Sequence, residues 1–217
     1  MNHEEIISHT TKFVKSTLSD AEGGHDWWHI HRVWKLSKTI AVKENVNLLV
    51  VELGALLHDI ADSKFHGGDE EIGPKISRDY LESININKET IDHVTNIIRH
   101  ISYSKSLEFK TFNTHELRIV QDADRLDAIG AIGIARAFNY GGHKGRAIYD
   151  PEIKPDTNMT KEEYKNSQAP TINHFYEKLL KLKDLMNTET GHLIAQHRHD
   201  FMLNFLNEFY AECEGKL

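Results

Sequence analysis

The chain has 217 residues, of which 39% are hydrophobic and 27% are charged, and its formal net charge is −7. This length suits one sizeable domain or two small ones, and the acidic balance argues against a general binder of nucleic acid, so no duplex partner is expected. The single cysteine, Cys213, excludes an intrachain disulfide and a cysteine-based zinc site. Because the N-terminus lacks a signal-peptide pattern and no apolar run is long enough to span a membrane, the sequence predicts a cytoplasmic protein without a membrane partner.

Apolar residues recur at helical spacing through almost the whole chain, and no strand alternation is sustained. The helix over 47–60 is apolar nearly all round, which predicts a central position. Asp26 is placed to cap the helix that follows it, and residues 139–158, with a Gly-Gly pair and two prolines, predict a long loop. The predicted helices cover residues 6–18, 26–40, 47–60, 74–83, 88–100, 116–137, 160–186 and 189–212.

This pattern predicts the all-α class, with one irregular helical domain over residues 1–217. The core of the domain is expected at about 20–140, and a C-terminal extension of further helices is expected at about 160–217. These last helices are expected to pack either on the core or on a second copy of the chain, so a homodimer stays open.

Histidines and carboxylates gather in a few segments that could converge in space. The most informative is the end of the apolar helix, where His58 and Asp59 are adjacent and Asp62 follows one turn after His58. Neighbouring side chains on a helix point about 100° apart, so they rarely serve one packing purpose. A helix end with His58 near the negative end of the dipole is one interpretation. A ligand bound by both residues is the other, and similar segments around His29 and Asp124 favour it.

These segments resemble the HD-domain superfamily of metal-dependent phosphohydrolases, whose pattern is a His, then a His-Asp pair, then a distant Asp. His29 precedes an Arg-Val by two residues, His58-Asp59 is the pair, and Asp124 lies in an Ala-Asp-Arg-Leu phrase. The resemblance is closest to the bacterial subfamily of nucleotide pyrophosphohydrolases. Its phrases HDW, HDIADSKF, DADRLDAIG, FNYGG and HFYEKLL all occur here in order, so the resemblance covers most of the chain.

The resemblance implies a metal site of His29, His58, Asp59 and Asp124. Two imidazoles and two carboxylates carry a total charge of −2, which balances one divalent cation. Mixed nitrogen and oxygen ligands suit Mn, Mg, Co, Fe or Ni, and a six-coordinate ion would keep about two positions open for water and a phosphate oxygen. Such an ion polarises a phosphoryl group and supplies the positive charge that the acidic chain otherwise lacks.

Asp62 and Lys64 are the predicted catalytic residues. Asp62 is on the same helical face as His58 and is expected to orient or deprotonate the attacking water, as an acidic residue at this offset does in the resembled superfamily. Lys64 is expected to neutralise phosphate oxygens. For both residues a solvated surface position stays open as the alternative.

Four further residues are predicted to contact substrate. His25 lies one turn before His29 and is expected to touch a substrate phosphate or to hold Asp26 in place. Asp127 competes with Asp124 for the metal, but the Ala-Asp-Arg-Leu match favours Asp124, which leaves Asp127 either supporting a metal ligand or facing the substrate. Lys144 and Arg146 belong to a glycine-rich basic loop that could close over a triphosphate, although a solvated surface turn fits the loop equally well. His100 is a candidate ligand for a second metal, for which a fifth histidine is not evident.

The resemblance implies a hydrolase that cleaves nucleoside triphosphates, including deoxy forms, to monophosphate and pyrophosphate. Its expected partner is therefore a small nucleotide. Two alternatives keep the metal and change the substrate, namely a nucleoside monophosphatase and a cyclic-nucleotide phosphodiesterase. A third alternative is a non-catalytic module that senses nucleotides, which would bind tightly without turnover.

Overall fold

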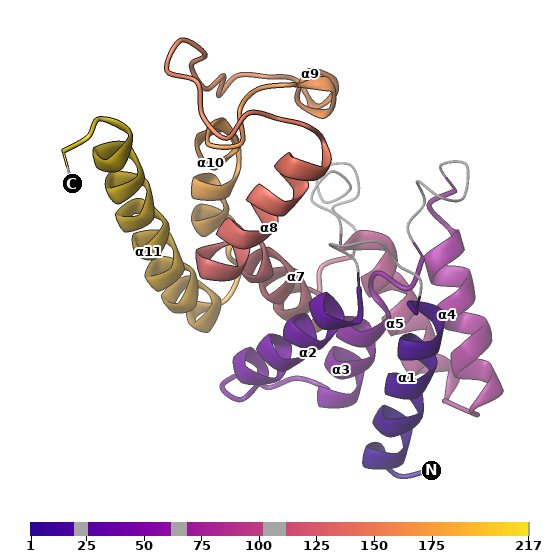
Figure 1. The fold of residues 1–217 in the computed structure, drawn as a ribbon. Helices are drawn as coiled ribbons and strands as arrows, with labels where there is room; N and C mark the ends of the chain where they lie inside the picture. Colours follow the sequence, from indigo (N-terminus) through magenta and orange to yellow (C-terminus); the bar gives the residue numbers. More distant parts are fainter. Residues whose placement is uncertain (20–25, 62–68, 102–111, 217) are drawn as a thin grey trace. The chain divides into compact units, whose positions relative to one another are not determined.

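The computed structural model describes residues 1–19, 26–61, 69–101 and 112–216 (Figure 1). Within these ranges every regular element is a helix, ten α-helices and one 3₁₀ helix, which confirms the all-α prediction. None of these helices combines the length and the apolar character that crossing a membrane requires. The chain forms two compact units, Met1–Asp124 and Arg125–Leu217. The single domain over 1–217 stays a prediction.

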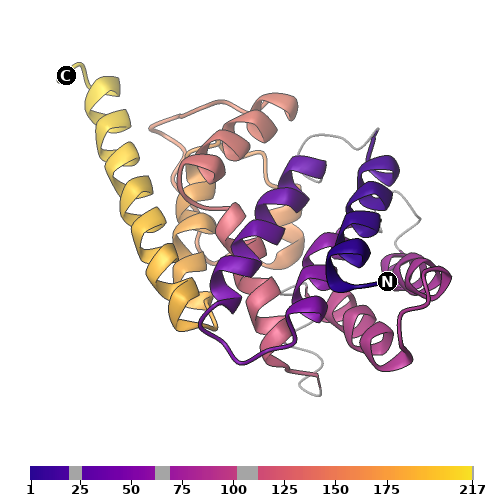
Figure 2. The same cartoon turned by 90° about the horizontal axis from the view of Figure 1, so that it is seen from below.

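Unit 1 is built around α3 (Leu48–Leu57), which packs on α1, α2 and α5. Every residue of α3 from Val50 to Leu57 is buried, so the predicted central position of this apolar helix is confirmed. Helices α4 and α5 pack on each other (Figure 2). The other helices of this unit are α1 (His3–Thr17), α2 (Trp27–Ala41), α4 (Ile72–Ser83), α5 (Lys88–His100) and α7 (His115–Asp127), whose last turn belongs to unit 2.

One carboxylate interrupts the apolar surface of α3. Glu52 is only 2% exposed, and a buried charge is costly unless it is paired and hydrogen-bonded. The indole nitrogen of Trp34 donates to Glu52 Oε1 at 2.9 Å, and the Lys38 ammonium lies 3.3 Å from the same oxygen. His3 of α1 contacts the other oxygen. Glu52 therefore links α1, α2 and α3 by polar contacts inside the unit.

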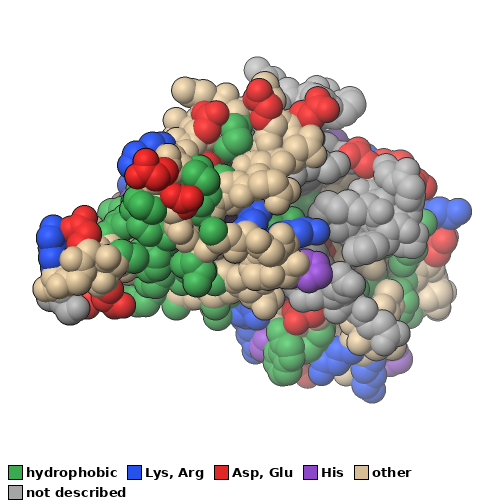
Figure 3. All heavy atoms as spheres, turned by 45° about the horizontal axis from the view of Figure 1, so that its top comes forward, with side chains coloured by type: hydrophobic (Ala, Val, Ile, Leu, Met, Phe, Trp, Pro, Cys, Tyr) green, Lys and Arg blue, Asp and Glu red, His purple; other side chains and the backbone are tan. Residues whose placement is uncertain are grey.

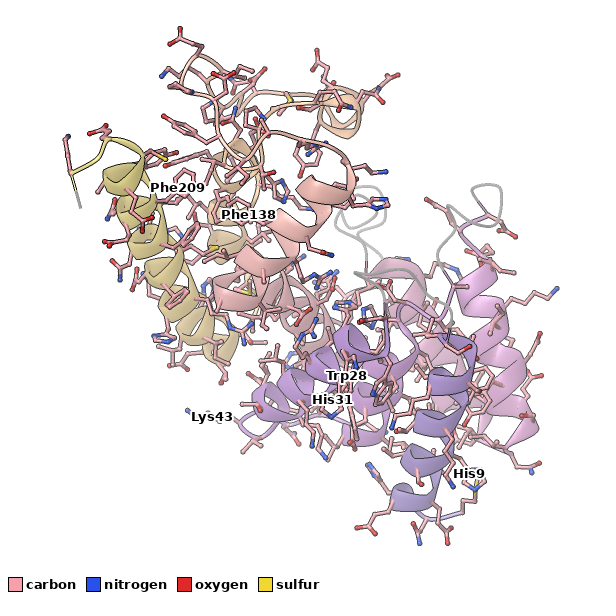
Figure 4. The ribbon with its side chains drawn as sticks, in the orientation of Figure 1. His9, Trp28, His31, Lys43, Phe138 and Phe209 are labelled. Carbon is pink, nitrogen blue, oxygen red and sulfur yellow. The ribbon has the colours of Figure 1, made fainter. Side chains whose placement is uncertain are left out.

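Unit 2 contains α8 (Gly130–His143), α9 (Lys161–Asn166), α10 (Asn173–Glu177), the 3₁₀ helix η2 (Leu179–Leu185) and α11 (Glu189–Cys213). Helix α11 packs on α8 and η2. Aromatic rings join these helices, since Phe138 of α8 lies 6.1 Å from the ring of Phe175 and 5.9 Å from that of Phe205 (Figure 4). Phe209 continues the cluster along α11, 6.0 Å from Phe205.

The predicted helix over 116–137 is wrong, because the structure divides it into α7 and α8. Gly130 has φ +76°, a left-handed conformation that ends a right-handed helix. A Cβ at Gly130 would also lie 2.9 Å from Cγ of Arg198, so this glycine permits α11 to approach the junction closely. The guanidinium of Arg198 donates to the Leu126 carbonyl at the end of α7.

Two further predicted boundaries are wrong in unit 2. The helix over 160–186 is three short helices, and Pro170 lies in the gap between α9 and α10, where a proline disfavours a helical residue before it. The predicted loop over 139–158 begins later, since α8 continues to His143. Gly141 within α8 allows a close approach, because a Cβ there would lie 2.1 Å from Oγ1 of Thr171.

Helix α11 leaves apolar side chains exposed on its outer side. Leu193, Phe201 and Leu203 are all exposed, and Figure 3 shows apolar side chains gathered over this part of unit 2, at the left of the view. These side chains are not part of the core of unit 2. The predicted homodimer stays a prediction.

Candidate metal centre

Three elements of unit 1 supply the predicted metal ligands. His29 lies in the first turn of α2, where the Asp26 side chain accepts a hydrogen bond from the His29 backbone N–H at 2.9 Å, which confirms the predicted cap. His58 is the C-cap residue of α3, and Asp59 follows it directly. Asp124 lies on α7. The N-terminus of α2 thus positions His29, and the C-terminus of α3 positions His58 and Asp59.

The four side chains converge. Nε2 of His29 lies 3.3 Å from Nε2 of His58, 3.5 Å from Oδ2 of Asp59 and 3.6 Å from Oδ1 of Asp124. Nε2 of His58 lies 3.6 Å from Oδ2 of Asp59 and 3.9 Å from Oδ1 of Asp124. In the part of the chain that the structure describes, His29, His58 and Asp59 form the group whose ligand atoms all lie within 4.8 Å of one another, and Asp124 lies near both imidazoles but outside that group.

The orientation of the His58 ring is set by the backbone. Its Nδ1 lies 2.8 Å from the Ala55 carbonyl oxygen, which can only accept, so Nδ1 carries the proton. A neutral His58 therefore presents a bare lone pair on Nε2 toward His29 and the carboxylates. A hydrogen bond from one ring nitrogen that fixes the other as a ligand is typical of metal-binding histidines.

The geometry and the donor set fit a divalent ion. An ion bonded at about 2.0–2.2 Å leaves neighbouring ligand atoms roughly 3 Å apart, and the observed separations exceed this by a few tenths of an ångström to about 1 Å. Small side-chain movements would close that difference. The two imidazoles are buried, whereas the side chains of Asp59 and Asp124 are 29% and 41% exposed. The centre therefore opens to solvent on its carboxylate side, where a ligand could enter.

The other predicted site residues are placed differently or lie outside the described residues. His25, Asp62 and Lys64 belong to the ranges that the structure does not describe. Asp127 is in unit 2, only 1% exposed, and its carboxylate forms an ion pair with Arg136 of α8.

The two basic residues of the glycine-rich loop lie together in unit 2. Lys144 is exposed, and Arg146 is half-buried and donates to the Ser167 carbonyl at 2.6 Å. Lys144 Nζ and the Arg146 guanidinium each lie 5.7 Å from the ring of Tyr140. Their predicted contact with substrate stays a prediction.

His100 is not part of the described ligand group. Its Nδ1 lies 2.8 Å from the Asn96 carbonyl, and its ring packs near Phe112.

The Ala55 carbonyl that orients His58 could not be predicted from the sequence, because a backbone acceptor has no signal in residue identity. The three-residue spacing to His58 was the only cue.

Comparison with known proteins agrees with this geometry. The model of the HD domain family matches residues 27–129, which include all four converging side chains. YpgQ of Bacillus subtilis is 39% identical over 206 residues, which cover 94% of this chain and 91% of YpgQ. The chain belongs to the HD-domain family.

Solved structures extend the likeness of this HD-domain protein over its whole length. An HD-superfamily hydrolase from Bacillus thuringiensis is 43% identical, with a TM-score of 0.78 and coverage of 98% of this chain and 99% of that one. Bacillus subtilis YpgQ in complex with ADP superposes with a TM-score of 0.77 at 35% identity, covering 98% of this chain and 97% of that one. The HD-domain protein is thus an HD-superfamily hydrolase in which two buried histidines and the partly exposed Asp59 form a group suited to a metal ion.

Proposed function

We propose that this HD-domain protein is a metal-dependent phosphohydrolase that cleaves nucleoside triphosphates, including deoxy forms, to nucleoside monophosphate and pyrophosphate. The observation that carries the proposal is the convergence of His29, His58, Asp59 and Asp124 in unit 1. The ADP complex of the relative YpgQ supports a nucleotide as the ligand. The phrases shared with the nucleotide pyrophosphohydrolases support the choice of bond.

The donor set suits this chemistry. A divalent ion held by these four residues supplies positive charge beside a phosphoryl group and lowers the pKa of bound water. The buried imidazoles hold the inner side of the centre, while the partly exposed carboxylates of Asp59 and Asp124 border the open side. The cap on α2 and the Ala55 carbonyl hold His29 and His58 in place before any ligand arrives, and such preorganisation reduces the cost of binding.

The remaining predicted residues complete the proposal. Asp62 is assigned as the general base that takes the proton of the attacking water, and Lys64 as a cation that neutralises charge on the leaving pyrophosphate. His25, Lys144 and Arg146 are proposed contacts of the phosphate chain. Asp127 is the weakest of the proposed substrate contacts, because its carboxylate is buried against Arg136.

The test is a nucleotide panel incubated with protein loaded with Mn, Mg, Co, Fe or Ni. The panel contains nucleoside and deoxynucleoside triphosphates, monophosphates and cyclic nucleotides, and the products are separated by ion-exchange chromatography. We expect equal amounts of monophosphate and pyrophosphate from triphosphates. Asp59→Asn and Asp62→Asn should each lose most of the activity, whereas Asp79→Asn, the same change at an exposed site on α4, should keep it.

Other outcomes would replace this function with a different one. Orthophosphate released only from monophosphates would identify a monophosphatase, and opening of cyclic nucleotides would identify a phosphodiesterase. Tight nucleotide binding without any product, with Asp62→Asn identical to the unaltered protein, would identify a nucleotide sensor.

A further inference from the structure

All three tryptophans of the chain lie on α2, and two of them have clear structural partners. The Lys15 ammonium lies 4.6 Å from the ring centroid of Trp27, a favourable contact of a cation with an aromatic face. Trp34 has Lys35 and Lys38 at 5.3 Å from its ring, and its indole N–H donates to the buried Glu52. Trp27 and Trp34 therefore stabilise the packing of α2 in unit 1.

Trp28 differs from both. Its side chain is 62% exposed, the largest exposed apolar side chain among the described residues. Its ring contact is with His31, at 5.9 Å between centroids and an interplanar angle of 82°, and the two side chains lie next to each other in Figure 4. An edge-on contact covers little of the indole. Most of the indole is therefore exposed to solvent, and its aromatic face is accessible to a ligand.

The position of Trp28 links it to the metal centre. It directly precedes His29 on the first turn of α2, so the indole and the imidazole leave the helix about 100° apart, the first exposed and the second buried. Helix α2 carries Arg32, Lys35 and Lys38 and no acidic residue, in a chain whose net charge is −7. The positive charges of Arg32 and Lys35 favour an anionic ligand at this helix, whereas Lys38 pairs with Glu52 and the acidic Asp26 caps the N-terminus.

We propose that the Trp28 indole is a stacking platform for the base of the nucleotide whose phosphates bind at the metal centre. This inference rests on the proposed function, and it names the part of the substrate that reaches beyond the His and Asp side chains. Stacking on an aromatic ring is tolerant of base identity, because every base has a π-face. The site should therefore accept purine and pyrimidine nucleotides with similar affinity.

Intrinsic fluorescence tests the platform directly, because every tryptophan of the full chain is on this one helix. ADP, dCDP, ribose 5-phosphate and inorganic pyrophosphate are each titrated into the metal-loaded protein. We expect ADP and dCDP to quench the emission, and the two ligands without a base to leave it nearly unchanged. Equal changes with ADP and with pyrophosphate would overturn the inference.

Variants of Trp28 separate stacking from a structural effect. Trp28→Leu should weaken ADP binding by about tenfold or more in calorimetry, from the usual strength of base stacking. Trp28→Phe should keep most of the affinity but lose most of the quenching, since Trp27 and Trp34 remain. Phe201→Leu removes an exposed aromatic ring on α11 and should change neither quantity.

The failure of this inference is distinguishable from the failure of the proposed function. If triphosphates are hydrolysed and Trp28→Leu leaves both KM and the ADP affinity unchanged, the platform is wrong and the hydrolase stands. If no substrate is hydrolysed, ADP quenching that depends on Trp28 still supports the platform. A change in oligomeric state of Trp28→Leu on size-exclusion chromatography, with unchanged ADP affinity, would assign the indole to an interface between copies and overturn the inference.

Discussion

Asp127 offers a sharp test, because the sequence and the structure suggest different roles for it. The sequence predicts a residue that supports a metal ligand or faces the substrate, whereas the structure buries its carboxylate against the Arg136 guanidinium. Arg198 of α11 is also near, since burial lowers the pKa of its guanidinium and Asp127 opposes that shift. Replacing Asp127 with Ala would leave these two cations without the carboxylate between α7, α8 and α11.

The expected loss of stability arises because Asp127→Ala removes only one partner of the ion pair with Arg136. Removing one partner of a buried ion pair typically costs about 3–5 kcal/mol. The Arg136 side chain is 30% exposed, so water can solvate part of its charge, and we expect roughly 2–4 kcal/mol. For a chain of this size 1 kcal/mol shifts the Tm by about 2–4 °C, so the Tm should fall by roughly 4–16 °C.

Thermal unfolding followed by circular dichroism measures this effect. Asp184→Ala, the same change at an exposed residue of unit 2, is the control and should leave the Tm nearly unchanged. The double variant Asp127→Leu with Arg136→Met should recover part of the loss, because only Arg198 then remains as a cation that has lost this carboxylate. A Tm of Asp127→Ala equal to that of the unaltered protein, together with weaker nucleotide binding, would refute the structural role and support contact with substrate.

Two further predictions concern unit 2. Gly130→Ala should lower the free energy of unfolding by about 1–3 kcal/mol in urea titrations, because φ is +76° and the new Cβ would meet Arg198. Gly142→Ala, a helical site with open space, should instead be neutral or stabilising, and equal losses at both sites would contradict this argument. Burial, followed by the charges of Lys178 and Arg146, lowers the pKa of His174 to about 4 in the folded protein. In the unfolded chain this imidazole has its usual pKa of about 6.5, so between pH 6.5 and 4 the unfolded state binds a proton that the folded state does not. The free energy of unfolding should therefore decrease by at most about 3 kcal/mol as the pH falls from about 6.5 to 4. His174→Gln should reduce this dependence of the free energy of unfolding on pH. An unchanged dependence would exclude His174 as its source.

The sequence predicted most helices because their signals are local. The apolar run of α3 and the Asp26 cap of α2 are visible in neighbouring residues. The division of the helix over 116–137 depends on the backbone of Gly130 and on Arg198, a residue far along the chain. Pro170 was a local signal for a break in the predicted helix over 160–186. The helical spacing of apolar residues on both sides of Pro170 nevertheless favoured one continuous helix.

The candidate site likewise has a part that the sequence predicts and a part that depends on tertiary packing. The resemblance to the HD superfamily implied which four side chains would form the site. Their separations in space could not be predicted, because spacing along the chain does not determine how α2, α3 and α7 pack. The environment of Trp28 could not be predicted either, because Trp27, Trp28 and Trp34 lie on one helix and only tertiary packing distinguishes them.

The most direct test of the account is the metal content of the purified protein, measured by elemental analysis after loading and removal of free ions. The convergence of His29, His58, Asp59 and Asp124 predicts one divalent ion per chain. A free metal concentration 100 times the Kd should then stabilise the fold by about 2.7 kcal/mol. Asp59→Asn and His58→Ala should bind much less than one ion and lose this stabilisation. No bound ion under any loading condition, or one ion per chain retained in both variants, would contradict the account.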